Sequence, residues 1–294
     1  MITSSKNNQG QALLVILLIM AVALTVGLSI TSRSITDIKI SEISEESARA
    51  FSAAEAGVEE ALLAGEAGAL AGEFTTQTDA KVTYETTTSD FGAGNEFVFP
   101  SGINRDQVQT LWFAENDASL TKSYDVNSFK VYWGKPGDTG DNAAALEVTV
   151  YYQDAGGYKA SKYALDSNAV SRGNNFCPLS TPDPNCDSSE VDTFVTGGTA
   201  PMGGQTFQYS TRIKFKFYVP GVTKLIFARM RILYRDNQPL GAQGIGDTFP
   251  SQGLAITSTG YSGATSRKVQ VVKYHPAPPP FFDMVLYSKT NLSK

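Results

Sequence analysis

The sequence predicts an α+β fold in which one long N-terminal helix carries a mainly antiparallel β-rich head domain. Three observations lead to this prediction. An apolar run, QALLVILLIMAVALTVGLSI, begins at Gln11, and no charged residue occurs between Lys6 and Arg33. Helical periodicity then continues as far as Leu62. From Phe74 onward, β-branched and aromatic residues alternate with polar ones in short segments, which is typical of antiparallel strands.

The apolar run has the length and composition of a membrane-spanning helix, which we place at about residues 12–32. About 20 apolar residues at about 1.5 Å per residue cross about 30 Å of hydrocarbon. Thr25 and Ser29 are compatible with it, because a helical hydroxyl can bond the carbonyls of its own turn. A buried helix of a soluble domain is the first alternative, but such helices rarely lack charge for so long. A secretory signal peptide is the second, but no A-x-A-like cleavage site follows.

The same helix is predicted to continue to residue 64. The segment after the span contains no proline, and its first glycine is Gly57. Apolar residues recur at steps that are mostly three or four residues and predict one apolar stripe: Ile35, Ile38, Phe51, Ala54, Val58 and Leu62. Glu45 and Arg49 form a favourable i,i+4 pair. Gly65 begins a glycine-rich stretch that ends the helix. A helix over residues 11–64 would be about 80 Å long, with its first half in lipid.

Two motifs in this region resemble type IV pilins and pseudopilins. Residues 1–10, MITSSKNNQG, form a short polar leader that ends in Gly10, and ARAFSAAEAGVEEAL (Ala48–Leu62) resembles the helix end of PilX-type minor pilins. The resemblance covers about the first 63 residues. It implies that a prepilin peptidase cuts between Gly10 and Gln11. It also implies that the helix, including Phe51 and Glu55 of the motif, assembles with other pilin-like subunits.

Val15 departs from the pattern of that family. Major pilins carry Glu at the fifth residue after the cut, where it meets the terminal amine of a neighbouring subunit. Gln11 also stands where Phe is usual. A carboxylate in lipid is costly unless it is paired, so Val15 is easy to accommodate but removes the usual assembly contact. The resemblance therefore implies a minor or tip-proximal subunit.

Residues 65–294 are long enough for one sizeable core, which we expect to lie outside the cytoplasm. The net charge of −5 does not favour bulk nucleic-acid binding. Charges on the two flanks of the span leave its orientation open, so the placement of the head follows from the leader resemblance and the composition. The expected location is the bacterial inner membrane, crossed once, and then a cell-surface filament.

Several strands of the head are predicted from alternation and turn residues. They are listed here with their bounds: Phe74 to about Asp90, Phe129–Trp133, Leu146–Gln153, Tyr158–Leu165, Leu254–Thr259, Arg267–Tyr274 and Phe281–Tyr287. The turn at 154–157 joins the third and fourth as a hairpin, with Leu146, Val148, Val150 and Tyr152 facing the core. A second hairpin turns around Tyr261–Gly263. Pro276–Pro280 predicts an extended polyproline piece.

Residues 166–206 form a long loop of Ser, Gly, Asn and Pro, and loops of this length are usually functional. The loop contains both cysteines, Cys177 and Cys186. Their proximity, and an oxidising compartment, predict a disulfide that closes a small ring. The metal-binding alternative needs more ligands than are nearby.

Residues 206–219 and 224–235 flank Pro220–Thr223 and predict a hairpin. With Val219 opposite Lys224, one face would carry a ribbon of five bases: Arg212, Lys214, Lys216, Arg229 and Arg231. Like charges opposite each other are destabilising, which indicates either an anionic ligand (DNA or an acidic glycan) or a structural solution. The structural alternatives are an acidic neighbouring strand, such as one with Glu147, and a solvated face.

The sequence contains no catalytic motif, and we predict a structural and interaction protein without a cofactor. His275 is the only histidine and has no nucleophile motif near it. Asp138, Asp141 and Asn142 in GDTGDN are candidate calcium ligands, although EF-hand spacing is missing. An ordinary Asx-rich turn is the alternative.

The function that we expect is that of a minor subunit of a type IV pilus or a type II secretion-like filament. Its partners would be pilin-like subunits, the inner membrane and the prepilin peptidase. One alternative is a membrane-anchored adhesin- or lectin-like module that binds a surface glycan or DNA and does not polymerise. An anchored hydrolase is a further alternative for which no motif is present.

Overall fold

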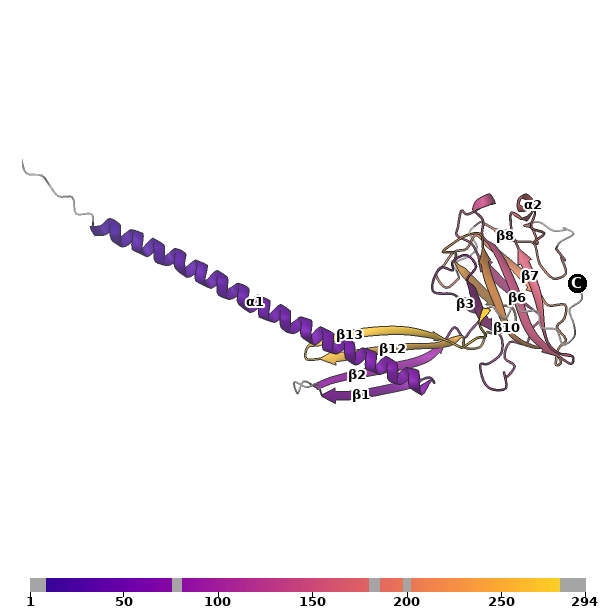
Figure 1. Cartoon of the computed structure of the whole chain (residues 1–294), viewed down its shortest axis with the longest axis horizontal. Coiled ribbons are helices and arrows are strands. Elements are labelled where there is room, and N and C mark those ends of the chain that lie inside the picture. Colours follow the sequence, from indigo (N-terminus) through magenta and orange to yellow (C-terminus); the bar gives the residue numbers. More distant parts are fainter. Residues whose placement is uncertain (1–8, 76–80, 180–185, 198–201, 281–294) are drawn as a thin grey trace, which may run out of the picture. The chain divides into compact units, whose positions relative to one another are not determined.

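The computed structural model describes residues 9–75, 81–179, 186–197 and 202–280, with side chains from Leu13 onward. It confirms the α+β class, with one long N-terminal helix followed by mostly antiparallel strands (Figure 1). The chain divides into two compact units. The first contains the chain up to Thr88 and Ile256–Val271, and the second contains Ser89–Ala255 and the chain from Val272 onward.

Helix α1 spans Gln9–Ala64 and begins two residues before the predicted start. Gly65 ends it with a φ of 71° and donates its N–H to the Ala61 carbonyl at 3.0 Å, which is the glycine stop that the sequence predicts. Arg49 pairs with Glu45 at 2.7 Å, as predicted. The Thr25 hydroxyl donates to the Val22 carbonyl at 2.8 Å, so this polar group is satisfied within the apolar part of the helix.

The first unit contains most of a four-stranded sheet with the order β1-β2-β12-β13. The strands are β1 (Gly68–Thr75), β2 (Lys81–Phe91), β12 (Gly253–Ser262) and β13 (Thr265–Tyr274). The β12–β13 hairpin is confirmed. The prediction of a single strand from Phe74 to Asp90 is wrong, because glycine-rich residues 68–75 pair antiparallel with β2 along their whole length. Glycines indicate a turn locally, but backbone pairing needs no side chains.

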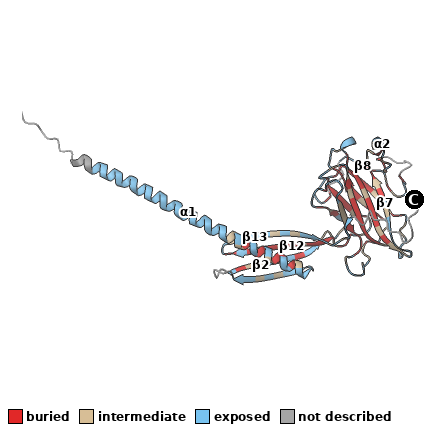
Figure 2. Ribbon diagram, viewed as in Figure 1, coloured by how far each residue is buried: buried red, intermediate tan, exposed pale blue. Residues whose placement is uncertain are grey.

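The second unit contains two further sheets, β4-β10-β6-β7 and β3-β11-β5-β9-β8. Their strands are β3 (Glu96–Val98), β4 (Val108–Trp112), β5 (Ser128–Trp133), β6 (Ala145–Asp154), β7 (Gly157–Leu165), β8 (Val195–Thr196), β9 (Tyr209–Lys214), β10 (Lys224–Leu233) and β11 (Leu240–Gly244). Short helices η1 (Gly140–Asn142) and α2 (Ala169–Arg172) lie in the connections. Buried side chains from both sheets form one core, among them Val148 and Met230 from one and Phe129 and Ile213 from the other (Figure 2).

Two predictions about this unit are confirmed. β5 matches the predicted strand at 129–133. β6 and β7 form the predicted hairpin, with Asp154 opposite Gly157, and the four side chains predicted to face the core are buried in it. The predicted strand Phe281–Tyr287 lies outside the described residues.

The predicted hairpin between residues 206–219 and 224–235 is wrong. β9 pairs with β5 and β8, whereas β10 pairs with β4 and β6 in the other sheet. Ile213 of β9 and Met230 of β10 are both buried in the common core. Alternating apolar residues are equally compatible with two strands side by side in one sheet and with two strands facing each other across a core, so the local pattern does not separate these arrangements.

Candidate functional site

The first half of α1 presents an apolar surface on every side. Each large apolar side chain from Leu13 to Ile43 is more than half exposed, as the pale blue helix in Figure 2 shows. Within the described residues, α1 is the one helix long and apolar enough to cross a membrane. A surface of this size is not stable in water and needs lipid or other apolar helices around it.

The residues that the sequence assigns to processing and assembly all lie along this helix. Gly10 and Gln11 are in its first turn, and their side chains lie outside the described residues. Val15 is 55% exposed, Phe51 is 46% exposed and Glu55 is exposed. These positions do not converge on one site. They remain available along the helix for contacts with lipid or with another chain.

The last part of α1 is instead buried on one face. Ala50, Ala53, Ala54 and Ala61 are fully buried, and Val58 joins Ile256 of β12 in a small apolar core. Of the predicted apolar stripe, Ala54 and Val58 are buried, whereas Phe51, Ile35 and Ile38 are exposed. The buried face consists of small residues because the helix lies very close to the sheet, and larger side chains would hold it away.

Glycines bring the helix and sheet into contact. A Cβ atom at Gly57 would collide with the hydroxyl groups of Thr86 and Ser258, which are buried and hydrogen-bonded to each other at 2.8 Å. A Cβ atom at Gly260 of β12 would lie 2.8 Å from the Ala53 Cβ. The Ala-Ala-Glu-Ala-Gly motif thus has a physical role in this chain, because it makes room for β2 and β12.

Polar contacts at the rim fix the helix along the sheet. Thr265 donates to Glu46 at 2.9 Å, and Arg267 donates to Ser47 at 2.7 Å, both from β13 to α1. Tyr84 of β2 donates to Glu60, and this bond is the largest cause of the raised pKa of Tyr84. Apolar, backbone and polar contacts together make the end of α1 part of a folded unit.

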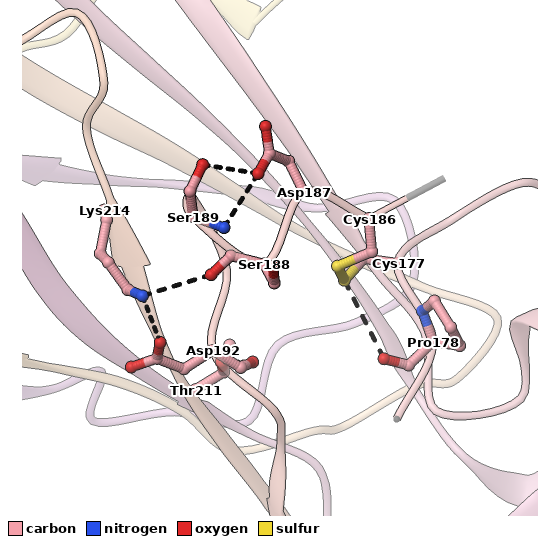
Figure 3. Close-up of a disulfide and its surroundings, with 9 residues drawn as sticks. All are labelled: Cys177, Pro178, Cys186, Asp187, Ser188, Ser189, Asp192, Thr211 and Lys214. Carbon is pink, nitrogen blue, oxygen red and sulfur yellow. Dashed lines mark hydrogen bonds and ion pairs between the residues drawn. A yellow bond between two sulfur atoms is a disulfide. The ribbon is translucent and has the colours of Figure 1, made fainter. Parts of the chain in front are cut away.

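The predicted disulfide between Cys177 and Cys186 is confirmed (Figure 3). Both cysteines are buried in the core of the second unit. The loop of residues 166–206 also contains α2 and β8, and it has a bridge between Val191 and Ile213 of β9. The described parts of the loop are therefore bound to the sheet and do not simply connect two strands.

The five bases predicted to form one ribbon are separated: Arg212 and Lys214 lie in one sheet, Arg229 and Arg231 in the other, and Lys216 in the turn after β9. Asp192 binds Arg212 at 2.8 Å and Lys214 at 2.5 Å, and Asp187 binds Lys216. In the other sheet, Arg231 lies opposite Glu147 in register, 3.9 Å away. The Arg229 guanidinium donates to the carbonyls of Pro278 and Pro279. The predicted ribbon is wrong, and the structural alternative with Glu147 is correct for Arg231.

The acids that bind this loop to β9 have lowered pKa values. The hydrogen bond from Lys216, assisted by bonds from Ser189, holds the pKa of Asp187 well below its ordinary value. Burial raises the pKa of Asp192, but hydrogen bonds from Lys214 and Arg212 outweigh it and lower that pKa. Lys214 also donates to the Ser188 carbonyl at 3.3 Å (Figure 3). The loop is thus held by charge pairs that persist at neutral pH.

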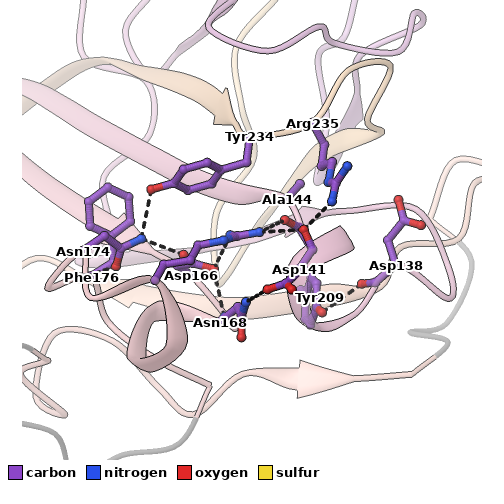
Figure 4. A network of polar contacts seen from close by, with 12 residues as sticks. Asp138, Asp141, Ala144, Asp166, Asn168, Asn174, Phe176, Tyr209, Tyr234 and Arg235 are labelled. Carbon is purple, nitrogen blue, oxygen red and sulfur yellow. Dashed lines mark hydrogen bonds and ion pairs between the residues drawn. The ribbon is translucent and has the colours of Figure 1, made fainter.

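The candidate calcium ligands have different partners, and Figure 4 shows Asp138 and Asp141 pointing apart. Asp141 accepts from Asn168 at 2.9 Å, whereas Asn142 accepts from the Arg235 guanidinium at 2.7 Å. The Asp138 carboxylate accepts from Gln238 at 3.4 Å. Among the residues that the structure describes, no three His, Cys, Asp or Glu side chains are grouped to hold a metal ion. Arg235 already supplies a cation at this turn.

Asp166 is the centre of a buried network that the sequence did not reveal. Its carboxylate is fully buried and accepts from Arg172 at 2.9 Å and from Asn174 at 2.7 Å (Figure 4). Arg172 in turn donates to the Ala143 carbonyl at 2.8 Å and lies 4.1 Å from the centroid of the Tyr234 ring. These contacts join β7, α2, η1 and the end of β10. Asp166 and Arg172 are six residues apart, but no local pattern pairs Arg172 with Ala143 or Tyr234.

His275 follows β13 and has no catalytic geometry around it among the described residues. Its backbone N–H donates to the Gln252 carbonyl at 3.0 Å, and burial lowers the pKa of its imidazole. A neutral imidazole beside a proline segment is consistent with a packing role.

Comparison with known proteins provides no relative from which to transfer a function. No family model and no curated protein matches the chain. Among solved structures, it is similar to Clostridium perfringens delta-toxin at 9% identity, over 72% of this chain and 86% of that chain, with a TM-score of 0.10. A TM-score of this size carries no argument about fold or function.

Proposed function

We propose that this chain is a minor, type IV pilin-like subunit, held in a membrane by the first half of α1 and incorporated into a filament through the same helix. One observation carries the proposal. A single continuous helix is exposed from Leu13 to Ile43 and free of charge as far as Ser32, and it is then packed against a sheet from Ala50 to Ala61. The exposed first part of this helix needs lipid or other apolar helices around it, and the packed last part connects it to a folded unit.

The same apolar surface serves in the membrane and in a filament. In lipid, acyl chains cover it, and in a filament the equivalent helices of other subunits would cover it. The leader that ends in Gly10 and the motif from Phe51 to Gly57 support this kind of subunit by resemblance. The close packing at Gly57 supports it physically, since the motif positions the helix on the sheet of the first unit. The function is structural and requires neither catalysis nor a cofactor.

Val15 supports a minor and tip-proximal position. A subunit inside a filament of this class offers a carboxylate near its start to the amine of the next subunit. Val15 offers no partner, and a buried unpaired charge costs several kcal/mol. A subunit with nothing above it avoids this cost.

Processing tests the proposal directly. We expect that the chain extracted from membranes of a cell with a prepilin peptidase begins at Gln11 by mass spectrometry, and that Gly10→Arg accumulates uncut. Gly10→Ala is the matched control, because it retains a small residue and should be cut. A wild-type chain that still begins at Met1 in such cells would contradict the proposal.

Copy number tests the position in the filament. Quantitative proteomics of sheared filaments should find this chain at far fewer copies than a Glu-bearing major pilin of the same cell. If this chain is the most abundant filament protein, the inference from Val15 is wrong.

A membrane-anchored binding module is the second candidate, and it is favoured by the separate core of the second unit. Replacing residues 1–43 with an unrelated membrane anchor distinguishes the two functions. A binding module would still bind a surface glycan or DNA with the new anchor. A filament subunit would no longer appear in sheared filaments.

A further inference from the structure

The sheet of the first unit ends in two edge strands, β1 and β13. Within the described residues, each pairs with a strand on one side only, so the backbone N–H and C=O groups on its other side have no strand partner. Six of the eight residues of β1 are exposed, and Leu70 and Gly72 are partly buried. β1 contains no Lys and no Pro, which often protect a sheet edge from pairing with another chain. This edge is therefore open to the addition of a strand.

The two edges carry opposite charge. Glu73 is the one charged residue of β1, and its ion pair with Lys81 is exposed and contributes little. The part of β13 that belongs to the first unit, residues 265–271, contains Arg267 and Lys268 and no acid. An acidic edge attracts a basic edge, whereas two copies of β13 would bring bases together.

β1 runs along α1 towards the start of the helix. Leu70 packs against the small apolar core around Val58. Phe74, four residues later, lines a groove together with Ala48 and Ser52 of the helix. The apolar part of β1 therefore lies near Val58, and its charged part lies nearer the start of the helix.

β13 covers the same stretch of α1 in the opposite direction. Arg267 donates to Ser47 at 2.7 Å, and Val271, four residues later, packs against the core around Val58. The apolar part of β13 thus also lies near Val58, and its charged part also lies nearer the start of the helix. The two edges match each other in polarity, level by level along α1.

The two opposite charges also share one face of the sheet. Phe74 of β1 and Arg267 of β13 lie against the helix, so their neighbours Glu73 and Lys268 project from the other face. Lys268 is exposed. Pairing of the two edges between two chains can therefore bring Glu73 and Lys268 together without turning either sheet over.

We propose that β1 of one copy of this chain pairs antiparallel with β13 of a second copy, with Glu73 opposite Lys268 of that copy. The same register places Phe74 beside Arg267 of the second copy, where a guanidinium and an aromatic ring attract each other. It also places the apolar parts of the two strands side by side. The interface is heterologous, because each copy contributes a different edge.

This pairing keeps the two α1 helices parallel and on one face of a continuous sheet, because both copies have the same orientation. Two chains that are inserted in one membrane in the same way need such an arrangement. An antiparallel pairing of β1 with β1 would instead point the two helices in opposite directions. The inference goes beyond the proposed function, since it requires two copies in one membrane and no filament.

Disulfide crosslinking tests the proposal in the full chain. Ala71→Cys and Gln270→Cys, at positions that would lie opposite each other, are made in two differently tagged copies, which are expressed together in a bacterial host without pilin-like proteins. We expect mild oxidation of the membranes to form the mixed dimer, with a 71–270 bond identified by mass spectrometry. The matched control replaces Ala71→Cys with Glu85→Cys, which pairs with Ala71 in register but lies one strand further from the edge. Its yield of mixed dimer should be at least five times lower.

Three outcomes of this experiment would overturn the proposal. The first is a mixed-dimer yield no higher than that of the Glu85→Cys control. The second is equally efficient crosslinking between two Ala71→Cys chains, which would indicate pairing of identical edges. The third is crosslinking of Ala71→Cys mainly to a different protein, which would indicate another partner.

Charge reversal gives an independent measurement of the register. Glu73→Lys in the Ala71→Cys copy should lower the yield of mixed dimer at least threefold, because it places Lys opposite Lys. Lys268→Glu in the Gln270→Cys copy should then restore the yield to within about twofold of the original. A change that only disturbed the fold of one copy would not be restored by a change in the other. Absence of restoration would overturn the pairing of Glu73 with Lys268.

Discussion

Gly260 of β12 lies so close to Ala53 of α1 that a Cβ atom at position 260 would be 2.8 Å from the Ala53 Cβ and 2.5 Å from the Ala54 nitrogen. Those atoms belong to the helix backbone and a short side chain, so neither can move aside alone. Gly57 approaches Thr86 and Ser258 equally closely from the helix side. The spacing between helix and sheet is therefore set by the absence of side chains on both.

Gly260→Ala should loosen the contact between α1 and the sheet. Overpacking of this kind costs about 1–3 kcal/mol, which corresponds to amide exchange roughly 5 to 150 times faster in residues 50–61 and in β12. Hydrogen-exchange mass spectrometry of the full chain in nanodiscs measures this effect. Gly68→Ala is the matched control, since a Cβ atom there meets nothing within 4 Å. The close-packing explanation fails if the two variants exchange alike.

Asp166→Asn should destabilise the second unit strongly. It leaves the largely buried Arg172 cation without its carboxylate, and breaking a buried ion pair costs about 3–5 kcal/mol. Denaturant unfolding followed by tryptophan fluorescence measures the loss, because Trp133 is fully buried in this unit. Asp106→Asn, at an exposed carboxylate 4.0 Å from Arg105, should change stability by less than about 0.5 kcal/mol. A similar small change for Asp166→Asn would show that the network is not important for stability.

The Cys177–Cys186 bond should contribute about 2–3 kcal/mol to the stability of the second unit, because it closes a short ring in the unfolded chain. Cys177→Ala/Cys186→Ala removes the bond while keeping small side chains at two buried positions. Its free energy of unfolding should match that of the reduced wild type more nearly than that of the oxidised wild type. Protein from the native host should resist alkylation until a reductant is added, and free thiols at that stage would contradict the bond.

Acid should release the loop at Asp187–Asp192 from β9. Both carboxyl groups have lowered pKa values in the folded state, so their stabilisation is complete above the unfolded pKa of about 3.9 and is lost as the pH falls below it. Exchange protection of residues 187–192, corrected for intrinsic rates, should be constant from about pH 8 to 5 and fall below about pH 4. Asp187→Asn/Asp192→Asn should lack this acid step. Loss of protection between pH 8 and 5 would mean that another group holds the loop.

Local features of the chain were correctly predicted from sequence. The helix follows from a charge-free run, 3.6-residue periodicity and a glycine stop, and Gly65 ends it as expected. The β6–β7 and β12–β13 hairpins follow from alternation on both sides of a short turn. The disulfide joins cysteines nine residues apart. In each case the interacting groups are close along the chain, so their chemistry is visible in one short window.

Contacts between distant residues were decided by the tertiary structure alone. β9 and β10 are nearly adjacent in sequence, yet they belong to different sheets, because Ile213 and Met230 gain more by facing each other's sheet across a common core than a local hairpin would offer. The fold also placed Asp192 beside Lys214 and Asp187 beside Lys216, two of the bases that were predicted to form one ribbon. It also placed Arg172 against the Ala143 carbonyl and the Tyr234 ring.

The sequence by itself thus determined that this chain is a long, partly membrane-compatible helix joined to a β-rich, disulfide-bonded head. Hydrophobic periodicity and turn chemistry are properties of neighbouring residues, and they specify elements without specifying their partners. Which strand pairs with which, and which acid neutralises which base, depends on the burial of whole faces at once. Only the folded arrangement decided that Gly57 and Gly260 bring helix and sheet together and that the bases of β9 and β10 belong to different sheets.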